Sequence, residues 1–321
     1  MEGDTAVPHL NDRAMRVADR IVASADDLAV TVSRVAGARV VDAGVEQRGC
    51  IAAGVLTARV CLADLGEVSI VPGRVAQTRI PAVAVHVSRV VAACMASQYA
   101  GWRISVGKYF AMASGPMRAA ARKEALFEDI GCAEQPECAV GVLESADLPD
   151  ATVIRHIADE CRVEPDRLTL IVARTASIAG GTQIAARSVE TAMHKLHELR
   201  FDLSRVVSGY GVAPLAPVAA DDIAAIGRTN DAVLYGAEVT LYVDSDDETL
   251  RQIGEQLPSN TSKDYGEPFA AIFGRYDHDF YKIDPMLFSP AAVCLQNVRS
   301  GRVHRFGAVN DQVLARSFFG E

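Results

Sequence analysis

The chain has 321 residues, of which 50% are hydrophobic and 23% are charged, proportions that are typical of a globular protein. Its 32 basic and 41 acidic residues give a net charge of −9, which is the wrong sign for covering nucleic-acid phosphates. No apolar run reaches the ~18 residues of a membrane span, and the acidic N-terminus lacks the layout of a signal peptide. We therefore expect a cytoplasmic protein with neither nucleic-acid nor membrane partners.

A single core stops growing below this size, so the length favours two domains or one large domain with a cleft. Small ligands commonly bind in such a cleft. The seven cysteines form an odd-numbered, scattered set without a CxxC motif or paired histidines. We expect them to be reduced thiols of a cytosolic protein, and we expect no metal site.

Along the chain, residues 11–29 predict an amphipathic helix, because apolar side chains recur at helical spacing. Residues 30–90 consist of short β-branched runs between glycines and prolines and are expected to be mostly sheet. Residues 88–97 are rich in alanine and are expected to be helical. Together they form a sheet-rich α+β part, for which we predict the bounds 1–120.

The remaining part, predicted as residues 121–321, alternates strands and helices. Strands are expected at 137–145 and 168–177, a helix at 150–161, and one long helix at 180–200. The glycine- and proline-rich stretch that follows, to residue 236, is expected to be mainly functional loop. The predicted fold class is α+β, with two α+β domains, mixed sheets and layered helices.

The helix predicted over 183–199 carries a polar stripe opposite its apolar face. The stripe consists of Gln183, Arg187, Glu190, His194 and His197, spaced four, three, four and three residues apart. One interpretation is a solvated face whose Arg187–Glu190 pair contributes only about a few tenths of a kcal/mol. The alternative is that Arg187 and Glu190 face a cleft, with the glycine-rich entry at Gly180 and Gly181 letting backbone amides approach a ligand.

Other patterns are less specific. Dinucleotide, P-loop, zinc-protease and α/β-hydrolase motifs are all missing from the sequence. Asp277, His278 and Asp279 offer a weak candidate metal site. A second group of short acceptors is expected in glycine-flanked loops, where it could bind the N–H groups of a pterin or merely cap turns; its members are Thr229, Asn230, Asp231 and Asp264.

Longer segments resemble one family, the methenyltetrahydromethanopterin cyclohydrolases, in order and spacing over almost the whole chain. The segments are SQYAGWRISVGKYFAMASGPMRA (97–119), ESADLP, RSVETAMHKLHE (187–198), VSGYGVAPLAPVAADDIAAIGRTNDAVLYG (207–236), SKDYGEPF and DFYKIDPMLFSPA (within 262–291), and the final VLARSF.

The resemblance implies reversible hydrolysis of N5,N10-methenyl-tetrahydromethanopterin to the N5-formyl form, without a metal or organic cofactor. It also implies two α+β domains with the substrate in the cleft between them, and a homo-oligomer, since some members are trimers. Matching RSVETAMHK places the family's active-site residues on Arg187 and Glu190. Ser97 and Gln98, which open the first segment, are predicted to bind substrate. The composition favours a bacterial formaldehyde-oxidation pathway over methanogenesis.

The implied substrate carries a cationic amidinium carbon that is already electrophilic. The protein must supply a positioned water, a base and a negative charge, and Glu190 is predicted to serve as the base and the charge. Arg187 is predicted to orient Glu190 and keep it ionised. Two alternatives remain: a cyclohydrolase acting on a folate-type cyclic amidine, and a non-catalytic carrier of reduced pterins.

Overall fold

A computed structural model describes residues 9–320. The contacts divide these residues into two compact units, and each unit takes two separate stretches of the chain. Unit 1 contains residues 9–65 and 91–174, and unit 2 contains residues 66–90 and 175–320. The predicted boundary at residue 120 falls within helix α3 (Met117–Ala121) of unit 1. Each unit holds helices and one mixed six-stranded sheet, which confirms the α+β class.

In unit 1 the strand order is β1-β2-β8-β7-β6-β5, with β2, β8 and β7 parallel and the outer pairs antiparallel. The central strands β7 and β8 are almost entirely buried because helices cover parallel strands on both faces. The strands span Thr31–Val35 (β1), Ala38–Gly44 (β2), Trp102–Val106 (β5), Tyr109–Ser114 (β6), Ala139–Glu144 (β7) and Leu168–Ala173 (β8).

Unit 1 also contains an eight-residue π-helix, η1, in the stretch predicted as helix. Most of residues 30–90 is strand, as expected, but residues 51–61 within that stretch form helix α2. Its N-cap is Cys50, whose Sγ accepts the Ala53 amide at 3.3 Å. The helical elements are α1 (Leu10–Ala23), α2 (Ile51–Cys61), η1 (Val91–Gln98), α3 (Met117–Ala121), α4 (Leu126–Ile130), α5 (Ala151–Cys161) and η2 (Pro165–Arg167).

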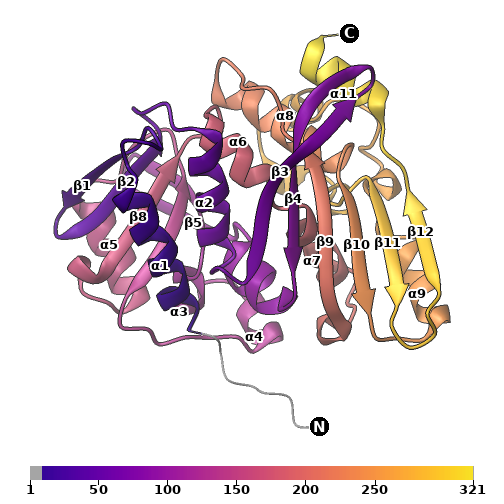
Figure 1. Ribbon diagram of the computed structural model, residues 1–321, viewed down its shortest axis with the longest axis horizontal. Helices are drawn as coiled ribbons and strands as arrows, with labels where there is room; N and C mark the ends of the chain where they lie inside the picture. Colours follow the sequence, from indigo (N-terminus) through magenta and orange to yellow (C-terminus); the bar gives the residue numbers. More distant parts are fainter. Residues whose placement is uncertain (1–8, 321) are drawn as a thin grey trace. The chain divides into compact units, whose positions relative to one another are not determined.

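In unit 2 the strand order is β12-β11-β10-β9-β4-β3, and only β10 and β11 are parallel neighbours. Helices α7 and α9 pack on one face of this sheet, and they lie behind the strands in Figure 1. The strands span Gly66–Val75 (β3), Thr78–Val87 (β4), Val206–Pro214 (β9), Glu238–Val243 (β10), Ala292–Asn297 (β11) and Val303–Gly307 (β12).

The helices of unit 2 enclose an aromatic cluster built from α8, α10, α11 and the 280–288 segment, in which Phe269 and Tyr235 are fully buried. The helical elements are α6 (Ile178–Ala185), α7 (Ser188–Glu198), η3 (Leu203–Arg205), α8 (Asp222–Leu234), α9 (Asp247–Gly254), η4 (Ser259–Thr261), α10 (Phe269–Arg275), η5 (Phe280–Lys282), η6 (Pro285–Leu287) and α11 (Asp311–Phe319). Within residues 9–320, no helix combines the length and apolarity needed to cross a membrane.

Two sequence predictions for unit 2 were wrong. The single helix expected over 180–200 is two helices, α6 and α7, separated at Ala186 and Arg187. The stretch expected to be loop forms most of β9 and the 13-residue helix α8. Helix α8 begins where Asp221 accepts the Ala224 amide at 2.9 Å, a capping interaction that outweighs the helix-breaking effect of the nearby glycines and prolines.

Candidate functional site

Arg187 and Glu190 come together where helix α7 begins. Arg187 immediately precedes the helix, and Glu190 lies in its first turn. Arg187 Nη1 is 3.9 Å from Glu190 Oε2, and Arg187 Nη2 donates to Gln183 Oε1 at 3.0 Å. Both residues are buried, with 8% of Arg187 and 5% of Glu190 exposed. Gln183, Arg187 and Glu190, the first three members of the predicted polar stripe, therefore form one cluster. We call its two charged members the Arg187–Glu190 pair.

The break between α6 and α7 preserves the helical spacing of this cluster. The Arg187 amide donates to the Ile184 carbonyl at 3.0 Å, which tightens the end of α6. The Arg187 carbonyl then accepts the Thr191 amide at 2.8 Å and so starts α7. Because both helices use the junction, Gln183 and Glu190 remain within one turn of Arg187 although they lie on different helices.

The position of Glu190 suits a negative charge. The N-terminal turn of an 11-residue helix carries partial positive charge on its free amides, and this stabilises a nearby carboxylate. A buried carboxylate also requires a cation or hydrogen bonds to remain charged, and the Arg187 guanidinium is close enough to provide the cation. The arrangement can therefore hold an ionised carboxylate, able to accept a proton or to face a cationic ligand.

The rest of the stripe lies farther along α7. Burial lowers the pKa of His194, whereas Glu198, whose Oε1 is 3.8 Å from His194 Nε2, opposes that shift. On the other side of the helix, Lys195 is fully buried, and its Nζ donates to the Met286 carbonyl at 2.5 Å. Burial lowers the pKa of Lys195 to about 8. This buried cation fastens α7 to the 280–288 segment and so limits movement of the helix.

The glycine-rich entry expected to bind a ligand has a different role. Gly180 and Gly181 lie inside α6, and the Gly180 amide donates to the Ser177 side chain, which caps that helix, at 2.9 Å. A prediction based on free amides at this point is therefore wrong. The glycines instead belong to the buried surface of α6.

The acceptors predicted in loops at 229–231 lie on helix α8, which corrects their placement. Thr229 Oγ1 and Asn230 Nδ2 donate back to the carbonyls of Ala225 and Ile226, both at 2.9 Å. Asp231 is fully buried and accepts the Phe269 amide at 2.8 Å, which joins α8 to the start of α10. These contacts give each of the three side chains a role inside unit 2.

Asp264 lies in the loop that follows η4 and is also buried. Its carboxylate accepts the Tyr276 hydroxyl at 2.9 Å and the Asp284 amide at 3.0 Å, and Arg275 Nη1 is 3.7 Å away. The carboxylate thus holds the loop between η4 and η6 together. None of these contacts of Asp264 involves Arg187 or Glu190.

Ser97 and Gln98 belong to unit 1, where they end the π-helix η1. Both are buried, and Ser97 Oγ donates to the Cys61 carbonyl at 2.5 Å. The Ser97 carbonyl accepts the Gly115 amide at 2.8 Å and Arg118 Nη1 at 3.2 Å. Short π-helical segments often occur at functional sites, and here three contacts fix the backbone that carries Gln98.

The three side chains of the candidate metal site at 277–279 contact other parts of unit 2 rather than converging on one point. Asp277 Oδ2 is 3.4 Å from Lys282 Nζ, and the His278 ring packs edge-on against Phe273 at 5.0 Å. The Asp279 side chain caps the short helix η5. Over the described part of the chain, no group of three or more His, Cys, Asp or Glu side chains is arranged to hold a metal ion.

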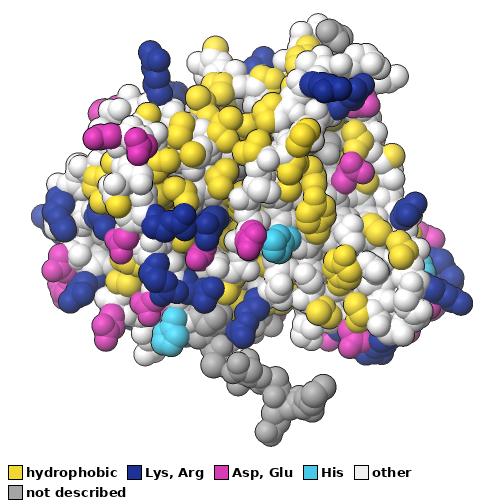
Figure 2. All heavy atoms as spheres, in the orientation of Figure 1, with side chains coloured by type: hydrophobic (Ala, Val, Ile, Leu, Met, Phe, Trp, Pro, Cys, Tyr) yellow, Lys and Arg dark blue, Asp and Glu magenta, His cyan; other side chains and the backbone are white. Residues whose placement is uncertain are grey.

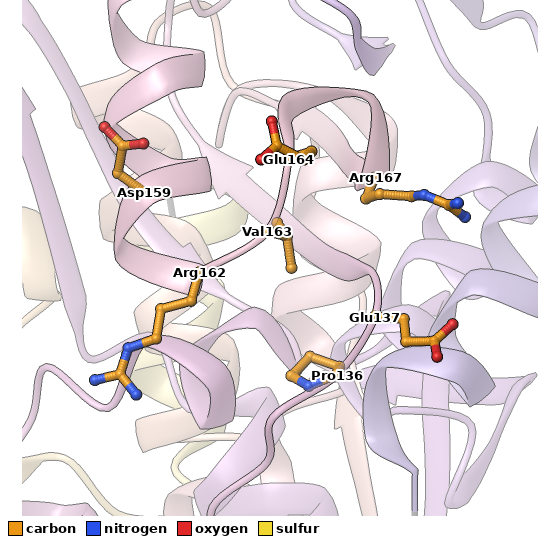
Figure 3. Close-up of a pocket in the computed structure, with 7 residues that line it drawn as sticks. All are labelled: Pro136, Glu137, Asp159, Arg162, Val163, Glu164 and Arg167. Atoms are coloured by element: carbon orange, nitrogen blue, oxygen red, sulfur yellow. The ribbon is translucent and has the colours of Figure 1, made fainter.

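Unit 1 has a surface hollow of about 570 Å³ at the end of helix α5. Figure 3 shows that the long side chains of Arg162 and Arg167 point in different directions, so the charges do not converge on one point. None of the predicted site residues lines it. The lining residues are Pro136, Glu137, Asp159, Arg162, Val163, Glu164 and Arg167.

Gln183 belongs to the predicted polar stripe but was not among the predicted site residues. Its hydrogen bond to Arg187 makes it part of the cluster, and the spacing of four residues was the signal. Gly209 and Gly211 were interpreted as loop glycines, whereas they lie in β9 directly beneath α7. The alternation of glycine with the exposed Tyr210 was the available signal, since small residues on one strand face allow close packing.

Comparison with known proteins agrees with the resemblance drawn from the sequence. The family model described as cyclohydrolase (MCH) matches residues 9–318. The methenyltetrahydromethanopterin cyclohydrolase of Rhodopirellula baltica is 50% identical over 88% of this chain and 87% of its own length. Those of Methylobacterium sp. (strain 4-46) and Methanosarcina barkeri are 45% and 42% identical, and they cover 99% and 96% of the chain and 100% and 98% of their own lengths. The chain belongs to the cyclohydrolase (MCH) family.

Proposed function

We propose that this protein hydrolyses N5,N10-methenyl-tetrahydromethanopterin to N5-formyl-tetrahydromethanopterin, reversibly, as the names of its relatives indicate for them. The observation that carries the proposal is the buried Arg187–Glu190 pair at the first turn of α7. It offers one carboxylate beside one guanidinium, which is what a cationic amidinium substrate requires. The proposed role of Glu190 is general base and countercharge, and that of Arg187 is to orient Glu190.

The reaction needs two proton movements. A water attacks the bridge carbon and gives one proton to the Glu190 carboxylate, forming a neutral adduct with a hydroxyl on that carbon. The bond from the carbon to N10 then breaks, Glu190 returns its proton to N10, and the hydroxyl proton leaves to solvent as the formyl carbonyl forms. The products are the N5-formyl compound and one released proton. Because the amidinium is electrophilic by itself, we propose that no metal or organic cofactor takes part.

A spectrophotometric assay of methenyl-tetrahydromethanopterin tests the proposal directly. Glu190→Gln removes the base but keeps the size of the side chain, and we expect kcat to fall by about 10²–10⁴. Glu198→Gln is the matched control, because Glu198 lies two turns along the same helix and faces His194. Wild-type turnover by the Glu190 variant would contradict the assignment, and loss of turnover in a chelator would contradict the cofactor-free reaction.

The alternatives give different results in the same assay. A folate-type cyclohydrolase would consume methenyl-tetrahydrofolate faster than the methanopterin substrate. A carrier of reduced pterins would bind the substrate, as calorimetry can measure, without hydrolysing it.

The substrate-binding part of the proposal rests on Ser97 and Gln98, whose backbone is held rigidly at the end of η1. Gln98→Ala is expected to raise KM more than it lowers kcat.

Finer parts of the proposal concern the setting of the enzyme. All seven cysteines are free thiols, which supports a reducing cytoplasm. Exposed apolar side chains on the open face of the unit 2 sheet, among them Tyr210, Tyr242 and Val303, support a homo-oligomer, and the face is visible in Figure 2. The composition, as argued from the sequence, is what supports a role in formaldehyde oxidation. Light scattering and growth of a deletion strain on methanol would test these two points.

A further inference from the structure

The first turn of α7 lies directly on strand β9. A Cβ atom added at Gly209 would lie 2.6 Å from Val189 Cγ1, and one added at Gly211 would lie 2.3 Å from Ser188 Oγ and 3.0 Å from Ser188 Cβ. Real Cβ atoms essentially never lie under 3.0 Å from another heavy atom, so the 2.6 Å and 2.3 Å contacts would force a shift, and the 3.0 Å contact is already tight. Both glycines thus leave room for the two residues that separate Arg187 from Glu190 in the sequence.

The backbone conformation does not explain these glycines. Neither is among the residues with positive φ, and both lie within a regular strand. Gly209 is paired with Val87 of β4 and Leu241 of β10, and Gly211 with Val85 and Val239. Because β9 is held by a strand on each side, an added methyl group would displace α7 rather than the strand.

The side chains above the glycines cannot easily move away. Val189 is 1% exposed, and a β-branched side chain in a helix has essentially one allowed rotamer. Ser188 is fully buried, and its Oγ finds no hydrogen-bond partner within residues 9–320, so packing against Gly211 is what accounts for its position. Rotating the Ser188 hydroxyl would relieve one contact but would leave its Cβ and a Val189 methyl group too close.

We propose that Gly209 and Gly211 are positioning residues for the reaction, because they set the height of the α7 first turn above the sheet and hence the placement of Arg187 and Glu190. The inference rests on the proposed function. A displacement of under 1 Å at the reacting group can cost as much as about 10²-fold in rate. Gly209→Ala is therefore expected to lower kcat by about 10–10²-fold while KM changes less than about twofold.

The test enlarges the residue at position 209 and shrinks the facing residue at position 189, first separately and then together. Gly209→Ala, Val189→Ala and the double variant are compared by kcat, KM and thermal melting. In the double variant, the methyl group added on β9 occupies the space left by the removed valine methyls. We expect the kcat of the double variant to be at least about tenfold higher than that of Gly209→Ala. We also expect the double variant to melt at a higher temperature than Val189→Ala.

Two further glycines give matched controls in the same unit. A Cβ at Gly227 of α8 would lie 2.8 Å from Ala270 Cβ, so Gly227→Ala introduces similar crowding away from α7 and should lower the melting temperature without lowering kcat. Gly274 of α10 has open space at the Cβ position, and Gly274→Ala should change neither quantity.

Unchanged kcat in Gly209→Ala would overturn the inference. A loss of kcat that Val189→Ala does not rescue, and that follows the loss of stability as in Gly227→Ala, would also overturn it. Failure of the proposed function is recognised separately: wild-type protein would then not hydrolyse the substrate, or Glu190→Gln would retain turnover.

Discussion

Each unit contains an Arg–Glu pair whose arginine is buried, and the two pairs differ in the distance between their charged groups. In unit 1, Arg118 is fully buried, and its Nε donates to Glu124 Oε1 at 2.8 Å, with Nη2 on the same oxygen. Arg118 Nη1 donates to the carbonyls of Met95 and Ser97 at 3.0 and 3.2 Å. The guanidinium also lies 5.1 Å from the ring centre of Tyr99.

The pair in unit 2 is looser. The 3.9 Å between Arg187 Nη1 and Glu190 Oε2 exceeds the length of a hydrogen bond, so these two atoms attract each other without sharing a proton. In the unit 1 pair, Nε and Nη2 of Arg118 both donate to Glu124 Oε1. The two pairs therefore differ in geometry: hydrogen bonds from one guanidinium close the first, whereas charge attraction over a longer distance relates the guanidinium and carboxylate atoms of the second.

The largest expected effect comes from neutralising each carboxylate in turn. Glu124→Gln leaves the Arg118 charge buried without its partner, which is expected to cost about 3–5 kcal/mol of the free energy of unfolding of unit 1. Glu190→Gln should instead lower kcat, as stated above, with little change in melting temperature. Chemical denaturation and steady-state kinetics on both variants measure the contrast. Equal losses of stability in the two variants would remove the distinction between the pairs.

A second, smaller effect is expected from replacing each arginine by lysine. Arg118→Lys keeps the charge but cannot contact Glu124 and two carbonyls at once, so stability should fall. Arg187→Lys cannot both reach Gln183 and remain near Glu190, and we expect kcat to fall by about tenfold with the fold intact. The comparison would fail if Arg187→Lys lost stability as Arg118→Lys does, or if turnover did not change.

Elements with a clear hydrophobic period could be predicted from the sequence. Helices α1 and α5 have a one-sided apolar pattern, and β7 and β8 are continuous apolar runs, so all four lie where they were expected. Helix α2 was missed because its less buried face is also apolar, as at Val55 and Leu56, so the sequence shows no one-sided pattern. Helix α8 was missed because prolines and glycines precede it and Gly227 interrupts it, although tertiary packing on Ala270 requires a small residue there.

For the site too, spacing along the chain could be predicted, whereas contacts between elements could not. The i, i+3 and i, i+4 spacing placed Gln183, Arg187 and Glu190 together correctly, because the α6–α7 junction conserves that spacing. The break itself depends on how α7 meets the sheet, which local sequence does not reveal. The prediction that Asp231 and Asp264 bind substrate stays a prediction. Their partners within the fold, the Phe269 amide and the Tyr276 hydroxyl, could not be predicted from the sequence, because these contacts form only on folding.

The smallest expected effect concerns another buried carboxyl, Asp231, for which no ion pair occurs within the described residues. Burial raises the pKa of Asp231 from 3.8 to about 7, against the opposing hydrogen bond from the Phe269 amide. The folded protein therefore retains a proton that the unfolded chain loses above pH 3.8, and this contribution to stability is lost as pH rises to about 7. Asp231→Asn keeps an oxygen for the Phe269 amide but cannot ionise, so it should melt a few degrees higher than wild type at pH 8.

Melting curves at pH 5 and pH 8 measure this difference. Asp246→Asn is the control, since hydrogen bonds from Thr249 lower the pKa of Asp246 and leave it ionised at both pH values. That variant should shift the melting temperature equally at both pH values. If Asp231→Asn also shifted it equally at both pH values, Asp231 would already be ionised in the folded protein at pH 5, and the prediction would be wrong. A larger upward shift at pH 8 than at pH 5 is the expected result, because the pKa of Asp231 rises on folding from 3.8 to about 7.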